Sequence, residues 1–161
     1  MTEAAKIVVG IDGGDASVAA LELAVHEAML RATQVLAITC WPSTDRRDDA
    51  GPLPCSTDEE ATAVLEHVVR LVQRRHPQAP PIVREVQQNF AGPALVAASR
   101  DAELLVLGST TRGSFGRHHG RRTIEHCLLF AEAPVVIVPW TAAGLDQVDI
   151  ELDLHREPTT T

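Results

Sequence analysis

The stretch from Gly108 to Gly120 concentrates side chains that bind anions. After Gly108 it holds three further glycines, four Ser or Thr residues, two arginines and two histidines. An apolar run, Leu104–Leu107, precedes this stretch, and a helical pattern begins near Arg121. A loop that enters a helix N-terminus offers free backbone N–H groups and the positive end of the helix dipole. Phosphate is therefore the ligand chemistry that this loop favours.

The elements around this loop alternate between strand and helix. Short apolar or alternating runs predict strands at Ile7–Ile11, Gln34–Trp41, Ile82–Val86, Leu104–Leu107 and Val135–Val138. Helical spacing and capping residues predict helices at Ser17–Ala32, after Thr57, at Pro93–Arg100 and from near Arg121. Such alternation indicates a parallel sheet with helices on both faces. Sheets of this kind bind ligands at the carboxyl ends of their strands, where the strand order reverses. Gly10–Gly14 and Gly108–Arg122 both begin at such ends.

Four segments resemble the universal stress proteins. They read KIVVGID at Lys6–Asp12, LLVLG at Leu104–Gly108, HC at His126-Cys127 and APVVIVP at Ala133–Pro139. The resemblance covers roughly Lys6 to Trp140. It implies a Rossmann-like α/β domain in residues 1–142, with a five-stranded parallel sheet in the order 3-2-1-4-5 and helices on both faces. Residues 143–161 are expected to form an acidic tail or an added edge strand.

The nucleotide-binding motif of this family, G-x2-G-x9-G-[ST], is degenerate here. If Gly108 is its first glycine, Thr111 stands in place of the second, and Arg121-Arg122 stands in place of the final pair. Gly120 serves as the last glycine only if the loop is one residue shorter. Such glycines let the backbone approach phosphates without a Cβ in the way. We therefore expect weak or absent binding of ATP.

The resemblance also implies roles for residues outside the motif. Asp12 lies where relatives hold the ribose hydroxyls, although it can equally cap the Gly13-Gly14 turn. Cys40 lies where a backbone group contacts adenine, and a buried small hydrophobe suits that position as well. Arg121 and Arg122 can donate to phosphate from the first helical turn, plug the site, or lie in solvent. The candidate set for ATP or another adenine nucleotide is Gly10, Ile11, Asp12, Cys40, Gly108, Thr111, Gly120, Arg121, Arg122 and Thr123.

Composition argues against several classes of partner. The chain has 161 residues, with 14 Lys or Arg and 22 Asp or Glu, so its net charge is 14 − 22 = −8. That field repels nucleic acid and anionic membranes, and no apolar run reaches membrane-spanning length. Cys40, Cys55 and Cys127 cannot all pair, and they lack metal-ligand spacing. We expect a cytoplasmic protein without a metal, a nucleic-acid partner or membrane contact.

Three function classes follow from these observations. The first is a regulatory or sensor protein of the universal stress type, with an adenine-nucleotide or anion site. The second is a nucleotide-free regulatory dimer of the same fold. A nucleotide-hydrolysing or adenylate-transferring enzyme is less favoured, because no nucleophile and base are paired in the sequence. The resemblance also implies a homodimer joined through the last strand, at Val135, Val136, Ile137 and Val138.

Overall fold

Parallel strands build the centre of the domain. In the computed structural model, which describes residues 5–42, 55–110 and 117–140, five strands pair in the order β3-β2-β1-β4-β5, all parallel. Their bounds are β1 Lys6–Gly10, β2 Gln34–Cys40, β3 Ile82–Gln87, β4 Ala102–Thr110 and β5 Val135–Trp140. The predicted fold class and strand order are confirmed. Among the described strands, β3 and β5 lie at the two edges of this sheet.

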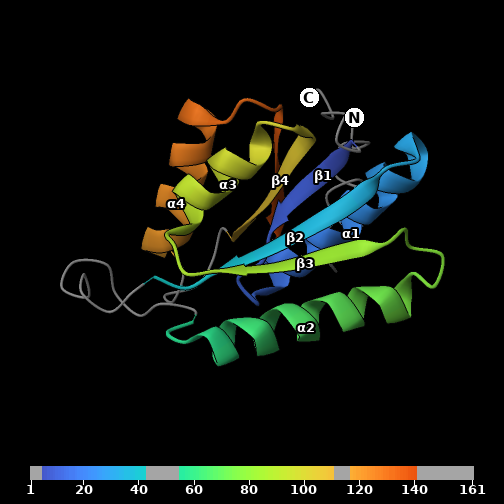
Figure 1. Ribbon diagram of the computed structural model, residues 1–161, viewed down its shortest axis with the longest axis horizontal. Coiled ribbons are helices and arrows are strands. Elements are labelled where there is room, and N and C mark those ends of the chain that lie inside the picture. Colours follow the sequence, from blue (N-terminus) through green and yellow to red (C-terminus); the bar gives the residue numbers. More distant parts are fainter. Residues whose placement is uncertain (1–4, 43–54, 111–116, 141–161) are drawn as a thin grey trace, which may run out of the picture.

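In the described part of the chain, two pairs of helices cover the sheet, one pair on each face. Their bounds are α1 Asp15–Arg31, α2 Asp58–Arg75, α3 Ala91–Ser99 and α4 Arg117–Phe130. Figure 1 shows α2 beneath β2 and β3, with α3 and α4 on the opposite side of the sheet. None of the helices described is long and apolar enough to cross a membrane.

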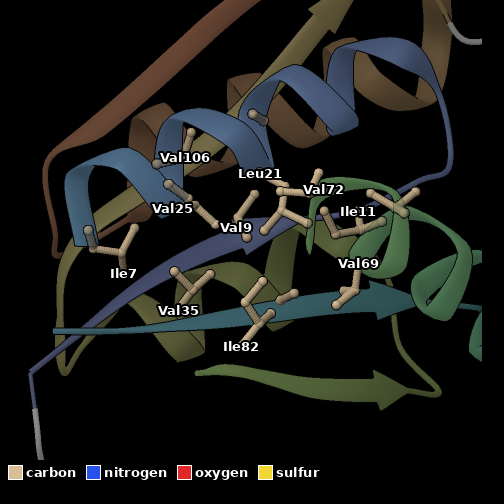
Figure 2. Packing of buried hydrophobic residues seen from close by; sticks show 14 of the residues in the cluster. Ile7, Val9, Ile11, Leu21, Val25, Val35, Val69, Val72, Ile82 and Val106 are labelled. Atoms are coloured by element: carbon tan, nitrogen blue, oxygen red, sulfur yellow. The ribbon is translucent and has the colours of Figure 1, made fainter. Parts of the chain in front are cut away.

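Side chains along the buried strands point alternately to the two faces of the sheet, and this divides the core into two clusters. Ile7 and Val9 of β1 point to the face covered by α1 and α2, where they pack with Leu21 and Val25 of α1 (Figure 2). Val8, between them, points to the opposite face and packs with Leu95 of α3 and Cys127 of α4. Because successive side chains of a strand point to opposite faces, a central strand must be apolar on both. This explains the unbroken apolar runs of the central strands, Ile7–Val9 in β1 and Leu104–Leu107 in β4.

Element ends differ from the predictions by a few residues. α1 begins at Asp15 rather than Ser17, and β4 extends on both sides of Leu104–Leu107. The predicted start of the last helix near Arg121 is wrong, because α4 begins at Arg117. Thr111 and the predicted tail or strand at 143–161 lie outside the residues that the structure describes.

Candidate functional site

A cleft opens at the carboxyl ends of β1, β2 and β4. The strand order reverses between β1 and β4, where chains of this architecture bind ligands. The cleft has a volume of about 90 Å³. Small-molecule pockets commonly measure about 300–1,000 Å³, so most of a nucleotide-sized ligand would lie outside this space. It is lined by Gly10, Ile11, Asp12, Ser17, Ile38, Cys40, Ala91, Leu95, Leu107 and Gly108.

Gly10 keeps this cleft open. A Cβ at this position would lie 3.0 Å from Cδ1 of Leu95 and 3.2 Å from Cδ2 of Leu107, tighter than most contacts of real Cβ atoms. Leu95 of α3, Leu107 of β4 and Ile38 of β2 are buried and give the cleft apolar walls. Apolar walls of this kind favour an uncharged group over a charged one.

A tight turn holds Asp12 at the mouth of the cleft. Its Oδ1 accepts a hydrogen bond of 2.8 Å from the backbone N–H of Gly14. Gly13 adopts a φ of 89°, which side chains other than glycine rarely accept. The predicted capping role of Asp12 is therefore confirmed. The bond uses one of several lone pairs of the carboxylate, so the exposed Asp12 keeps the capacity to accept hydrogen bonds from a ligand's hydroxyl groups.

Cys40 contributes a neutral thiol to the cleft. Burial, and secondarily the Glu85 carboxylate on β3, raise the pKa of the Cys40 thiol to about 12. The thiolate is the form that attacks electrophiles and binds metals, and it is scarce here near neutral pH. Among the described residues, moreover, no three His, Cys, Asp or Glu side chains are grouped to hold a metal ion. Cys40 therefore acts as a small apolar wall.

Gly108 has a packing role that the motif does not reveal. A Cβ on Gly108 would lie only 2.3 Å from the carbonyl oxygen of Ala16 and 2.4 Å from its carbonyl carbon. Glycine thus allows β4 to approach the first turn of α1, which begins directly after the Asp12 turn. A requirement for glycine at this position follows from strand–helix packing, whether or not phosphate lies nearby.

The predicted residues on α4 lie apart from this cleft. Arg121 and Arg122 are exposed and are not among its lining residues. Nε of Arg121 lies 3.0 Å from Oε1 of Glu125, one helical turn further on. Because α4 begins at Arg117, neither arginine belongs to the first turn, so of the three alternatives the one that places them there is wrong, and both side chains are exposed. Gly120 lies in the first turn of the helix and Thr123 is half-buried.

Sequence reasoning found half of the lining residues. The cleft brings together Gly10, Ile11, Asp12, Cys40 and Gly108 from the predicted set. It adds Ser17, Ile38, Ala91, Leu95 and Leu107. A signal existed for Ile38, which precedes Cys40 by two residues on one strand and so points to the same face. The residues of α3 gave no comparable signal, because helix packing alone decides which of them reach the strand ends.

Comparison with known proteins identifies the class. The model of the universal stress protein family matches residues 4–139, so the chain belongs to the universal stress protein family, as the sequence predicted. The universal stress protein Rv2623 of Mycobacterium tuberculosis (strain ATCC 25618 / H37Rv) is 30% identical over 133 residues. That match covers 83% of this chain and 44% of the relative, so the chain spans about half the length of the curated proteins it matches.

Solved structures share the fold. A universal stress protein in complex with cAMP has a TM-score of 0.58 and 22% identity, over 84% of this chain and 98% of that one. A universal stress protein from Archaeoglobus fulgidus in complex with dAMP has a TM-score of 0.57 and 22% identity, over 86% and 99%.

Proposed function

We propose that this protein is a regulatory or sensor protein that binds an adenine nucleotide in the cleft and binds ATP weakly. One observation carries the proposal: an apolar slot lies beside an exposed carboxylate at the point where the strand order reverses. The slot accommodates a flat base, and the carboxylate of Asp12 is available to the hydroxyl groups of a ribose. The complexes of two structural relatives with cAMP and dAMP support the choice of an adenine nucleotide as the ligand.

The phosphate groups contribute little to affinity in this proposal. Thr111 and Arg121 replace two glycines of the family motif, and a side chain at either position takes up space beside a phosphate. Arg122 is exposed and does not line the cleft. An arginine in water gains little from an ion pair, because solvent screens it. The base and the ribose therefore provide most of the binding energy.

Titration calorimetry with AMP and ATP tests the proposal. Wild-type protein should bind AMP, and ATP should bind no more tightly. Asp12→Ala should weaken AMP binding by about 10- to 100-fold, since a hydrogen bond to a charged group contributes about 1.5–3 kcal/mol. Asp15→Ala is a matched control, because Asp15 is an exposed carboxylate near the cleft that does not line it. Arg122→Ala should leave both affinities unchanged. ATP binding that weakens tenfold in Arg122→Ala would show a phosphate clamp instead.

A homodimer joined through Val135, Val136, Ile137 and Val138 is the proposed assembly. These residues are only half-buried, β5 is an edge strand among the residues that the structure describes, and an apolar edge strand favours pairing with another strand. Leu128, Leu129 and Phe130 at the end of α4 are exposed as well, with Leu129 at 76%. The same surface favours the second candidate function, a regulatory dimer that binds no nucleotide.

Sedimentation of paired edge-strand variants tests the assembly. Wild-type protein should sediment at twice the mass of one chain, and Val136→Lys should sediment as a monomer. Val83→Lys, on the opposite edge strand β3 and 45% exposed, is the control and should remain a dimer. Circular dichroism checks that both variants are folded. Dissociation by Val83→Lys alone would show that the interface lies at β3 instead. A dimer that is purified without nucleotide and does not bind AMP would support the second candidate function.

A further inference from the structure

The hydroxyl group of Ser17 makes two hydrogen bonds to the turn that carries Asp12. Ser17 lies in the first turn of α1, is 3% exposed and lines the cleft. Its Oγ donates to the carbonyl oxygen of Gly14 at 2.8 Å. The same Oγ accepts from the backbone N–H of Gly13 at 3.2 Å. A serine hydroxyl has one proton to donate, so its donor is already used within the protein.

These bonds join those of Asp12 in one closed network. Asp12 Oδ1 accepts from Gly14 N–H, and Gly14 in turn offers its carbonyl to Ser17. Asp12 is exposed, so neighbouring side chains do not hold it by burial. The two glycines between Asp12 and α1 have more conformational freedom to lose than other residues. The backbone N–H groups of Ser17 and Val18 already hold the Gly14 carbonyl, at 3.0 and 3.2 Å, and the Ser17 hydroxyl adds the bond to the Gly13 N–H. Without that hydroxyl, Gly13 would sample more conformations, and the carboxylate of Asp12 beside it would be held less firmly.

We propose that Ser17 is a positioning residue that orients the Asp12 carboxylate toward the ribose hydroxyls of a bound nucleotide. The inference rests on the proposed function and extends it to a residue that contacts Asp12 only through the turn. By fixing Gly13 and Gly14 before the ligand arrives, the Ser17 hydroxyl removes an ordering cost from binding. The gain in affinity should depend on the 2′ and 3′ hydroxyls of the ligand, because these are the groups that the oriented carboxylate binds.

Two ligands and two serine variants separate positioning from packing. Ser17→Ala should weaken AMP binding about tenfold, and should change the affinity for 2′,3′-dideoxy-AMP by less than about twofold. Ser99→Ala is the matched control. Ser99 is fully buried, and its Oγ likewise donates to one backbone carbonyl, of Val96 at 2.7 Å, and accepts from one N–H, of Glu132 at 3.1 Å. It lies at the C-terminal end of α3, away from the cleft.

Two results would overturn the inference by calorimetry. Equal weakening of AMP and its dideoxy analogue by Ser17→Ala would mean that Ser17 merely shapes the cleft. An equal effect of Ser99→Ala on AMP would mean that the loss reflects general stability. In the double variant Asp12→Ala with Ser17→Ala, AMP affinity should match that of Asp12→Ala alone, because Ser17 has no carboxylate left to orient.

Amide exchange tests the same link without any ligand. The exchange rate of the Gly14 N–H with water, measured by NMR, should rise about fivefold in Ser17→Ala, because the bond to Asp12 opens more often. An unchanged rate overturns the inference. If wild-type protein binds no AMP, the proposed function fails together with the ligand role of Ser17, and the Gly14 rate still decides whether Ser17 holds Asp12.

Discussion

Replacement of Gly108 by alanine distinguishes a packing glycine from a phosphate-binding glycine. Real Cβ atoms essentially never lie closer than 3.0 Å to another heavy atom, and the new one would lie 2.3 Å from the carbonyl oxygen of Ala16. β4 and α1 must therefore separate by at least about 3.0 − 2.3 = 0.7 Å. Both partners are backbone, so no side chain can rotate away. Overpacking usually lowers the free energy of unfolding by about 1–3 kcal/mol, and for Gly108→Ala we expect a loss of about 3 kcal/mol.

Urea unfolding monitored by far-ultraviolet circular dichroism measures this cost directly. In a thermal unfolding experiment on a domain of this size, a loss of about 3 kcal/mol should lower the melting temperature by about 6–12 °C. Gly92→Ala is the control, because its Cβ would lie 3.0–3.2 Å from side-chain atoms of His126, which can shift. We expect a change of less than about 1 kcal/mol there, since alanine also favours the helix. A Gly108→Ala protein of wild-type stability with reduced nucleotide affinity would refute the packing argument.

Three further predictions concern other parts of the structure. Burial, and secondarily Glu85, raise the pKa of the Cys40 thiol to about 12. Alkylation of Cys40 should therefore stay slow until the pH approaches that value. Peptide mass spectrometry measures the rate. The folded state holds this proton more tightly than the unfolded chain, so the thiol's contribution to stability, complete below pH 9.0, should be lost as the pH rises toward 12. Thr57→Ala should lower the free energy of unfolding by about 1 kcal/mol, because the Thr57 side chain accepts from the N–H of Glu60 at the start of α2. Gly10→Val should abolish AMP binding in calorimetry, because the valine side chain would meet the apolar walls of the cleft. It should also lower the free energy of unfolding by about 1–3 kcal/mol.

The sequence predicted the sheet because burial on both faces leaves a strong local signal. A strand such as Leu104–Leu107 must be apolar throughout when helices cover both faces. The strand order came from the family resemblance rather than from the runs themselves. Asp12 was found for a local reason too, since a carboxylate directly after a buried strand and before two glycines marks a strand end. These features depend on neighbouring residues in the chain.

The walls of the cleft depend on contacts between distant residues, and the sequence did not predict them. Leu95 reaches the strand ends because of how α3 crosses the sheet, and no pattern within α3 specifies that crossing. The contact of Gly108 with Ala16 is of the same kind, because it joins residues 92 positions apart. A motif glycine in the sequence therefore suggested phosphate, whereas the structure shows an approach of two backbones.

The position where α4 begins also changes what the arginines can do for a ligand. The dipole of a helix and its free N–H groups act within the first turn. With α4 starting at Arg117, Arg121 and Arg122 follow that turn, and Arg121 already pairs with Glu125. An exposed i, i+4 pair of this kind contributes about 0.3–0.5 kcal/mol to stability, so the ion pair with Glu125 holds the Arg121 side chain only weakly. Neither arginine therefore gains from the helix dipole, and the proposed site for the base and the ribose lies elsewhere, at the ends of β1, β2 and β4. In the proposed site, affinity for the nucleoside part is therefore separable from affinity for phosphate, so Asp12→Ala should weaken AMP binding and Arg122→Ala should leave the affinities for AMP and ATP unchanged.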